Sequence, residues 1–349
     1  MRVGLLACAV KIASKVVNPS SFSPIHRCIE LGPNCVRACS EYGTIQIPVE
    51  TELSEPALLD CVAVGAVIRS LGQYEEVYLH SEGNRVYWSN DNAHGHWDVV
   101  KEDNQIPAIS HSSFPWKPPD SFADALLLAS SAVDAASVSI GIYGLVIERR
   151  GKLLRLVSSN SISLALAVVP GEGYPTRDRI TIRPPIPSIL ASLLRLYPDL
   201  MLDVTRDGIF VEDDQVCCQL PLSPPLDHDL FAVADRFSTK KITAEIDPAA
   251  VKRFLLRAKA LTNRHMSSVV ELRIEAGNLI LLHKAFTSRT EEYLLADGID
   301  PSASLAPLLL PIELMTVPLE HVDTVVLDHL PQGVLVLQRE HPTFEYVLG

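Results

Sequence analysis

Three side chains that could bind a metal ion occupy alternate positions of one short segment. His94, His96 and Asp98 stand at i, i+2 and i+4 of a predicted strand, so they would share one face. Imidazole and carboxylate groups are ligands that zinc takes in proteins. No histidine or carboxylate cluster elsewhere in the sequence clearly completes such a site. The pattern favours a solvated hairpin, and we expect neither a metal nor a cofactor.

The sequence also lacks a recognisable catalytic set. The segment 171–173, Gly-Glu-Gly, predicts a turn and not a phosphate loop, because the Gly-Lys-Ser ending is missing. No Gly-x-Ser-x-Gly motif occurs, and no nucleophile, base and orienting group stand together. The seven cysteines are odd in number and lack paired zinc spacing, which indicates reduced thiols. We expect a cytoplasmic protein that is not an enzyme.

Length and composition set the broad class. The chain has 349 residues, 47% of them hydrophobic and 21% charged, which predicts two or three folded domains and excludes disorder. No uncharged apolar run reaches about 18 residues, so we expect no membrane span. The net charge of −12 excludes a protein that is basic all over. The net charge does not exclude a basic face on an acidic protein, because binding responds to local potential.

A repeat runs through the chain. Three segments read as an alternating strand, a tight turn with one glycine and a second strand, which is the pattern of a hairpin. They are residues 76–88, 202–212 and 325–337. Their turn glycines, Gly83, Gly208 and Gly333, are separated by 125 residues in both intervals. Such a period indicates repeated structural units.

The elements around these hairpins repeat as well. Earlier strand groups fall at 27–47, 145–165 and 269–295; helical patterns precede them at 4–17, 121–137 and 248–262, and precede the hairpins at 57–71, 186–197 and 311–322. We predict an α+β fold of three repeated domains, 1–115, 116–236 and 237–349, each with two helices packed on antiparallel sheets. A ring of such repeats would cover the sheet edges that otherwise aggregate.

This order of elements resembles the bacterial-type DNA sliding clamp, the β subunit of DNA polymerase III. Residues 22–25, Phe-Ser-Pro-Ile, resemble the family's turn into its first strand, and 36–42 its Ala-Thr-Asp-Leu-Glu strand end. Residues 156–165 align with the family's Ala-Thr-Asp-Gly-His-Arg-Leu-Ala segment, although Asn-Ser-Ile-Ser at 160–163 replaces its Asp-Gly-His-Arg. The last strand, 344–348, is also similar. The opening strand of the family is missing or very short and its C-terminal tail is missing, which favours a divergent clamp, phage- or element-encoded.

The resemblance implies a homodimeric ring that encircles duplex DNA without reading its sequence. It implies that DNA polymerase and the clamp loader attach to the ring through short peptides. The alternative is a clamp-fold adaptor that binds replication or transcription proteins without encircling DNA. The missing tail and the altered segment 160–163 favour the adaptor.

Basic helix faces would line such a ring. The segment 248–264 contains five basic residues and no acid, and Arg253 and Arg257 lie one turn apart. The apolar residues opposite them, Val251, Phe254, Leu255, Ala258 and Leu261, could pack on a sheet. The predicted DNA-binding residues are Lys11, Lys15, Arg69, Arg195, Lys252, Arg253, Arg257, Lys259 and Arg264. The alternative is that these are ordinary solvated faces. Acids on helices 121–137 and 311–322 predict weak DNA contact.

The resemblance also places two protein interfaces. The dimer interface would comprise Trp97, Val99, Ala260 and Leu261, with Trp97 and Val99 alternating outward; the alternative is that Trp97 packs within its own domain. The partner-peptide pocket would comprise Ile142, Ser159, Leu164, Arg236, Phe237, Val347 and Leu348. The alternative reading of Ile142, Leu164 and Val347 is simple core.

Overall fold

The structure is a computed structural model. It describes residues 2–348 apart from 73–74, 103–104, 110–114, 134–143, 161–162, 176–178, 206, 227, 238–243, 262–268, 276–277, 285–288, 295, 298–304, 312–323, 329–333 and 340–342. The chain forms two compact units. Unit 1 is Met1–Pro118, Gly173–Arg177 and Ser192–Leu222; unit 2 is Pro119–Glu172, Asp178–Ala191 and Ser223–Gly349. The fold is α+β, as predicted.

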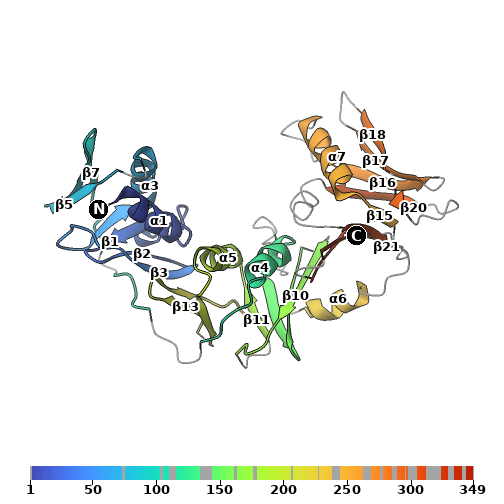
Figure 1. The fold of residues 1–349 in the computed structure, drawn as a ribbon, viewed down its shortest axis with the longest axis horizontal. Coiled ribbons are helices and arrows are strands. Elements are labelled where there is room, and N and C mark those ends of the chain that lie inside the picture. Colours follow the sequence, from blue (N-terminus) through green and yellow to red (C-terminus); the bar gives the residue numbers. More distant parts are fainter. Residues whose placement is uncertain are drawn as a thin grey trace. The chain divides into compact units, whose positions relative to one another are not determined.

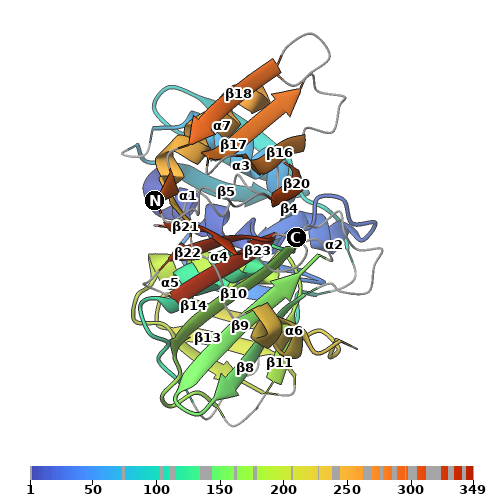
Figure 2. The ribbon, with the colours of Figure 1, turned by 90° about the vertical axis from the view of Figure 1, so that its right-hand side faces the viewer.

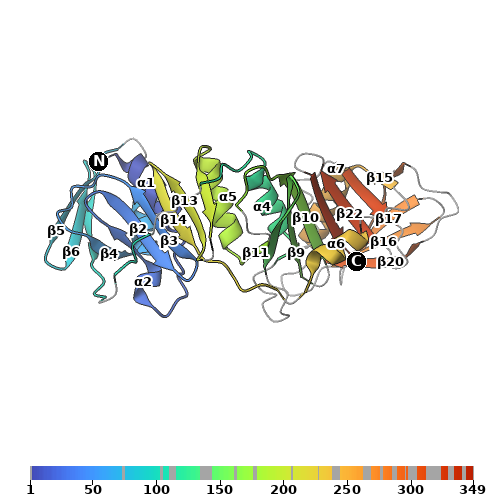
Figure 3. The ribbon, with the colours of Figure 1, turned by 90° about the horizontal axis from the view of Figure 1, so that it is seen from below.

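Unit 1 is built on an antiparallel sheet of strand order β12-β13-β14-β3-β2-β1-β4. Its strands are β1 (Cys28–Leu31), β2 (Cys35–Ser40), β3 (Gly43–Pro48), β4 (Ala57–Asp60), β12 (Met201–Val204), β13 (Ile209–Asp213) and β14 (Val216–Leu220). Figure 3 shows β2, β3, β14 and β13 side by side. Segments more than 160 residues apart thus form one sheet, because Cys218 of β14 pairs with Ile45 of β3.

Helices cover this sheet. α1 (Val3–Ala13) packs against α3 (Cys61–Ser70) and against β2 and β3 (Figure 1). A short helix, α2 (Pro24–Arg27), leads into β1. The predicted helix 57–71 is wrong in its first turn, because residues 57–60 form β4. The helix begins at Cys61, since the Asp60 carboxylate accepts a hydrogen bond from the Ala63 backbone N–H and caps its N-terminus.

A second, three-stranded sheet in unit 1 has the order β5-β6-β7. It comprises β5 (Tyr78–Glu82), β6 (Arg85–Ser89) and β7 (His94–Asp98). The predicted 76–88 hairpin is confirmed, with Gly83 at its turn (φ 60°). One face is buried, with Leu79, Val86 and Trp97 at its centre. The Trp88 and Trp97 rings lie 6.1 Å apart, centroid to centroid.

Gly95 is required for this packing, and Gly95→Ala should destabilise the sheet. An added Cβ would lie 2.7 Å from the Trp88 ring, closer than carbon atoms approach. We expect a loss of about 1–3 kcal/mol and a lower melting temperature by calorimetry. The control is Gly32→Ala, whose Cβ would lie 3.4 Å from its nearest neighbour. Equal melting temperatures for the two variants would contradict this account.

Unit 2 holds an antiparallel sheet of order β11-β8-β9-β10-β23-β22-β21-β15-β19. Its strands are β8 (Leu145–Arg150), β9 (Leu153–Ser159), β10 (Ser163–Pro170), β11 (Arg179–Ile182), β15 (Ala244–Ile246), β19 (Ala296–Asp297), β21 (Thr324–Asp328), β22 (Val334–Arg339) and β23 (Thr343–Leu348). Figure 2 shows β8, β9, β10, β23 and β22 in this order.

The other two predicted hairpins are confirmed. Residues 202–212 form β12–β13 in the sheet of unit 1, and residues 325–337 form β21–β22 in the sheet of unit 2.

Two helices lie on opposite faces of this sheet. Successive residues of a strand point to opposite faces. Ser158 of β9 donates a hydrogen bond to the Ala129 carbonyl of α4 (Phe122–Ser130), whereas its neighbour Val157 packs with α6 (Leu230–Phe237). The helix predicted over 121–137 ends at Ser130, and residues 134–137 lie outside the described residues. α5 (Ile186–Leu196) continues from unit 2 into unit 1.

A four-stranded sheet completes unit 2, in the order β18-β17-β16-β20. Its strands are β16 (Val269–Glu275), β17 (Asn278–Lys284), β18 (Arg289–Leu294) and β20 (Leu305–Pro311). α7 (Pro248–Leu261) contacts β18. Asp247 caps α7 as a helix N-terminus requires, since its carboxylate accepts from the Ala249 N–H at 2.9 Å. The predicted helix 311–322 lies outside the described residues, except for Pro311 at the end of β20.

Candidate nucleic-acid and partner-binding surfaces

α7 presents a basic face to solvent. Its inner face buries Val251, Phe254, Leu255 and Ala258, and Lys252, Arg253, Arg257 and Lys259 are exposed. The Arg253 guanidinium lies 3.7 Å from the Asp247 carboxylate, and this exposed ion pair contributes little to stability. The predicted packing of Leu261 is wrong. Its side chain is 43% exposed, because α7 ends at this residue.

The other predicted DNA-binding residues divide into three groups. Lys11, Arg69 and Arg195 are exposed on α1, α3 and α5. Lys15 is half-buried and lies beyond the end of α1, so the predicted helix through both lysines is too long. The Ser14 hydroxyl donates to the Lys11 carbonyl, a local bond that competes with helix continuation. Arg264 lies outside the described residues.

The sheet register brings together part of the predicted partner pocket. Leu164 of β10 pairs with Ser159 of β9 on one side and with Val347 of β23 on the other. Leu348 pairs with Ser163 in the next position. Strands β10 and β23, which are about 180 residues apart in the chain, are therefore neighbours in the sheet. Ile142 lies outside the described residues.

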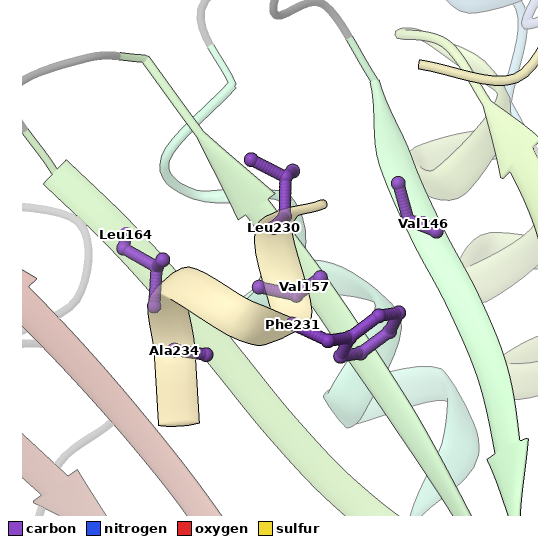
Figure 4. Packing of buried hydrophobic residues seen from close by; sticks show 6 residues of the cluster. All are labelled: Val146, Val157, Leu164, Leu230, Phe231 and Ala234. Atoms are coloured by element: carbon purple, nitrogen blue, oxygen red, sulfur yellow. The ribbon is translucent and has the colours of Figure 1, made fainter. Parts of the chain in front are cut away.

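Arg236 and Phe237 belong to α6, which packs on strands β8, β9 and β10. Leu230, Phe231 and Ala234 of α6 form one buried cluster with Val146, Val157 and Leu164 (Figure 4). Leu164 is only 5% exposed as a result. In this structure Leu164 is therefore buried beneath α6, which agrees with the alternative reading of this residue as core. The apolar spacing at 230, 231 and 234 is the sequence signal that could have identified this helix.

Charged side chains hold α6 in place. Asp229 accepts from the Phe231 and Ala232 backbone N–H groups and caps the helix, and Arg179 donates to the same carboxylate at 3.3 Å. At the other end of α6, Asp235 pairs with Arg155 at 2.5 Å and with Arg150 at 3.4 Å.

The Phe231 ring contacts two guanidinium groups. The ring centroid is 5.0 Å from the Arg155 carbon and 5.3 Å from that of Arg179, which are cation–π distances. The hydrogen bond from Arg155 lowers the pKa of Asp235. The stability that this pair gives to the folded state is therefore fully present above the ordinary pKa of a carboxyl group. It is lost as the pH falls through the lowered pKa of Asp235.

The predicted dimer-interface residues differ in exposure. Trp97 is 6% exposed and packs inside its own sheet, so the prediction that it points outward is wrong and its alternative holds. The reason is the buried face formed with Val86, its cross-strand partner. Val99 is half-buried just after β7. Ala260 and Leu261 are exposed at the end of α7.

The residues with metal-binding potential do not form a centre. His94, His96 and Asp98 are exposed on one face of β7, as predicted, but Asp98 pairs with Arg85 at 3.0 Å. No group of three or more potential ligands is placed to hold a metal ion within the described residues.

All seven cysteines are free thiols, and burial raises the pKa of Cys28 and Cys61 to about 11. None of the described helices is long and apolar enough to cross a membrane.

Comparisons with known proteins bear on the fold. No protein-family model and no curated protein matches the sequence. The crystal structure of the Caulobacter crescentus β sliding clamp matches with a TM-score of 0.81 and 16% identity over 100% of this chain and 96% of that chain. The Thermotoga maritima DNA polymerase III β subunit matches with a TM-score of 0.80 and 15% identity, covering 100% and 97%.

A third solved structure, the Helicobacter pylori β clamp bound to a DNA ligase peptide, has a TM-score of 0.75 and 12% identity, covering 100% of this chain and 98% of that chain. These matches span the whole chain at 12–16% identity. They show that this protein has the fold of the bacterial β sliding clamp.

Proposed function

We propose that the chain is a DNA polymerase processivity factor, a sliding clamp that encircles duplex DNA and carries out no catalysis. The observation that carries this proposal is the acid-free basic face of α7 on a clamp fold. Lysine and arginine side chains on a helix face contact phosphates without reading bases, which lets a protein slide. In this proposal the three domains are 1–115, 116–236 and 237–349, and the protein acts in the cytoplasm.

Strand pairing supports closure by a second copy. β14 pairs with β3, and β23 pairs with β10. In both cases the last strand of one predicted repeat pairs with the third strand of the predicted strand group, 27–47 or 145–165, in the preceding repeat. The remaining last strand is β7, the third strand of the group 269–295 is β18, and both are at sheet edges. We propose that β7 of one copy meets β18 and the end of α7 of another, which closes a homodimer.

Short peptides are the proposed means of attaching partners. The H. pylori clamp binds a DNA ligase peptide. We propose that this chain binds peptides from its DNA polymerase and clamp loader at the surface of β8, β9 and β10 on which α6 lies. The apolar residues Val146, Val157 and Leu164 at that surface support the proposal.

The second candidate is a clamp-fold adaptor that binds replication or transcription proteins without encircling DNA. Two observations favour it. The segment 160–163 departs from the clamp pattern, and α4 carries Asp124 in its first turn and no basic residue in its last. An acid there would weaken attraction to phosphates.

Retention on circular DNA separates the two candidates. The chain is loaded on a nicked plasmid, with a clamp loader if one is required, and isolated by gel filtration at 0.5 M NaCl. We expect the ring to remain on the circle and to be lost when the plasmid is cut once, because a topological link does not depend on salt, unlike phosphate contacts. A direct DNA binder would respond equally to both forms. Equal retention on circular and linear DNA, or none on either, would rule out encirclement.

A further inference from the structure

α6 covers an apolar surface that belongs to the strands of the sheet alone. Val146, Val157 and Leu164 from three adjacent strands form an apolar strip. Arg150, Arg155 and Arg179 border this strip, and Glu148 lies between Arg155 and Arg179 and pairs with Arg179 at 3.1 Å, which leaves a net positive border. An apolar strip with a basic border is suited to a segment that carries apolar side chains and carboxylates.

α6 has that chemistry. It places Leu230, Phe231 and Ala234 on the apolar strip, and it directs Asp235 to Arg155 and Arg150. Arg179 holds the N-cap residue Asp229. The helix therefore occupies the strip as a peptide ligand would, although it is part of the same chain.

The attachment of α6 is weak enough to be reversed. The helix spans eight residues, and a helix of that length does not persist alone in water. Its structure therefore depends on docking. Asp229 and Asp235 are about half exposed, so water and salt screen their ion pairs. The docked state depends mainly on Leu230, Phe231 and Ala234.

We propose that α6 is a displaceable lid over the partner-peptide surface, an inference that rests on the proposed function. When α6 leaves, the strip and its arginine border become available to a peptide with adjacent apolar side chains and a nearby carboxylate. The apparent affinity for such a peptide is reduced by the fraction of molecules in which α6 is undocked. Variants that loosen α6 therefore bind peptide more tightly.

The test uses a labelled peptide of residues 225–237, which carries the α6 sequence, and measures its binding to the full chain by fluorescence anisotropy. We expect Phe231→Ala in the full chain to bind this peptide at least tenfold more tightly than the unaltered chain, because the buried ring no longer holds the resident helix. Asp235→Asn retains the apolar contacts and should give about a threefold gain. The control is Val233→Ala, since Val233 is on the outer side of the same helix, 37% exposed.

The outcomes separate the lid from the proposed function. Equal peptide affinity for Asp235→Asn, Phe231→Ala and the unaltered chain, or no binding to any of them, would overturn the lid. The H. pylori ligase peptide is then added as a competitor to Phe231→Ala. Displacement of the labelled peptide supports both proposals. Failure to compete leaves the lid in place and contradicts the peptide-binding part of the proposed function.

Discussion

Reversing two charges on α7, with Arg253→Glu and Arg257→Glu together, should abolish stimulation of the DNA polymerase. Both side chains are exposed on a helix face without acids. Each lost phosphate contact lowers the dependence of log affinity on log salt by about 0.9. The proposed homodimer would lose four such contacts, so affinity for duplex DNA should fall roughly four-thousandfold at 0.1 M salt. The measurements are a salt titration of duplex binding and a primer-extension assay.

The matched control reverses two exposed charges at the β8–β9 turn, Arg149→Glu and Lys152→Glu. It changes the net charge by the same amount on a part of the sheet with no proposed DNA contact. If the control and the α7 variant lose the same affinity, only the overall charge matters. Unchanged stimulation by the α7 variant would contradict the assignment of this helix to the DNA-binding lining.

Leu261→Asp should convert the proposed dimer into a monomer. Leu261 is exposed at the end of α7, and its burial by another copy would contribute about 2 kcal/mol. A carboxylate there would also have to be desolvated. Because two chains that close a ring share two equivalent interfaces, the cost is counted twice, about 4–5 kcal/mol. The dimer dissociation constant should rise about a thousandfold.

Light scattering on a sizing column measures the mass directly. We expect about twice the 38.2 kDa chain mass for the unaltered protein and a single chain for Leu261→Asp at micromolar concentration. Leu256→Asp is the control, since Leu256 is exposed on the same helix outside the proposed interface. A dimer that survives Leu261→Asp would place the interface elsewhere. A monomeric unaltered chain would favour the adaptor or a ring that closes only with DNA or a partner.

The repeat was readable from the sequence because strand alternation and turn glycines are local signals. Gly83 and Gly208 are at the turns where the spacing places them, and the predicted hairpins are present. The amphipathic pattern of α7 and its Asp247 cap were equally readable, since both depend on residues within one or two turns. Element ends were less predictable. Asp60 and Ser14 shortened two helices through single hydrogen bonds.

By itself, the sequence determined the α+β repeat, the basic face of α7 and the absence of a recognisable catalytic set. Only the tertiary structure decided that Trp97 packs inward, that β14 joins β3 and β23 joins β10, and that α6 covers Leu164. These outcomes depend on pairings between segments far apart in the chain. Local periodicity shows that a residue will be buried, but not which distant element will bury it.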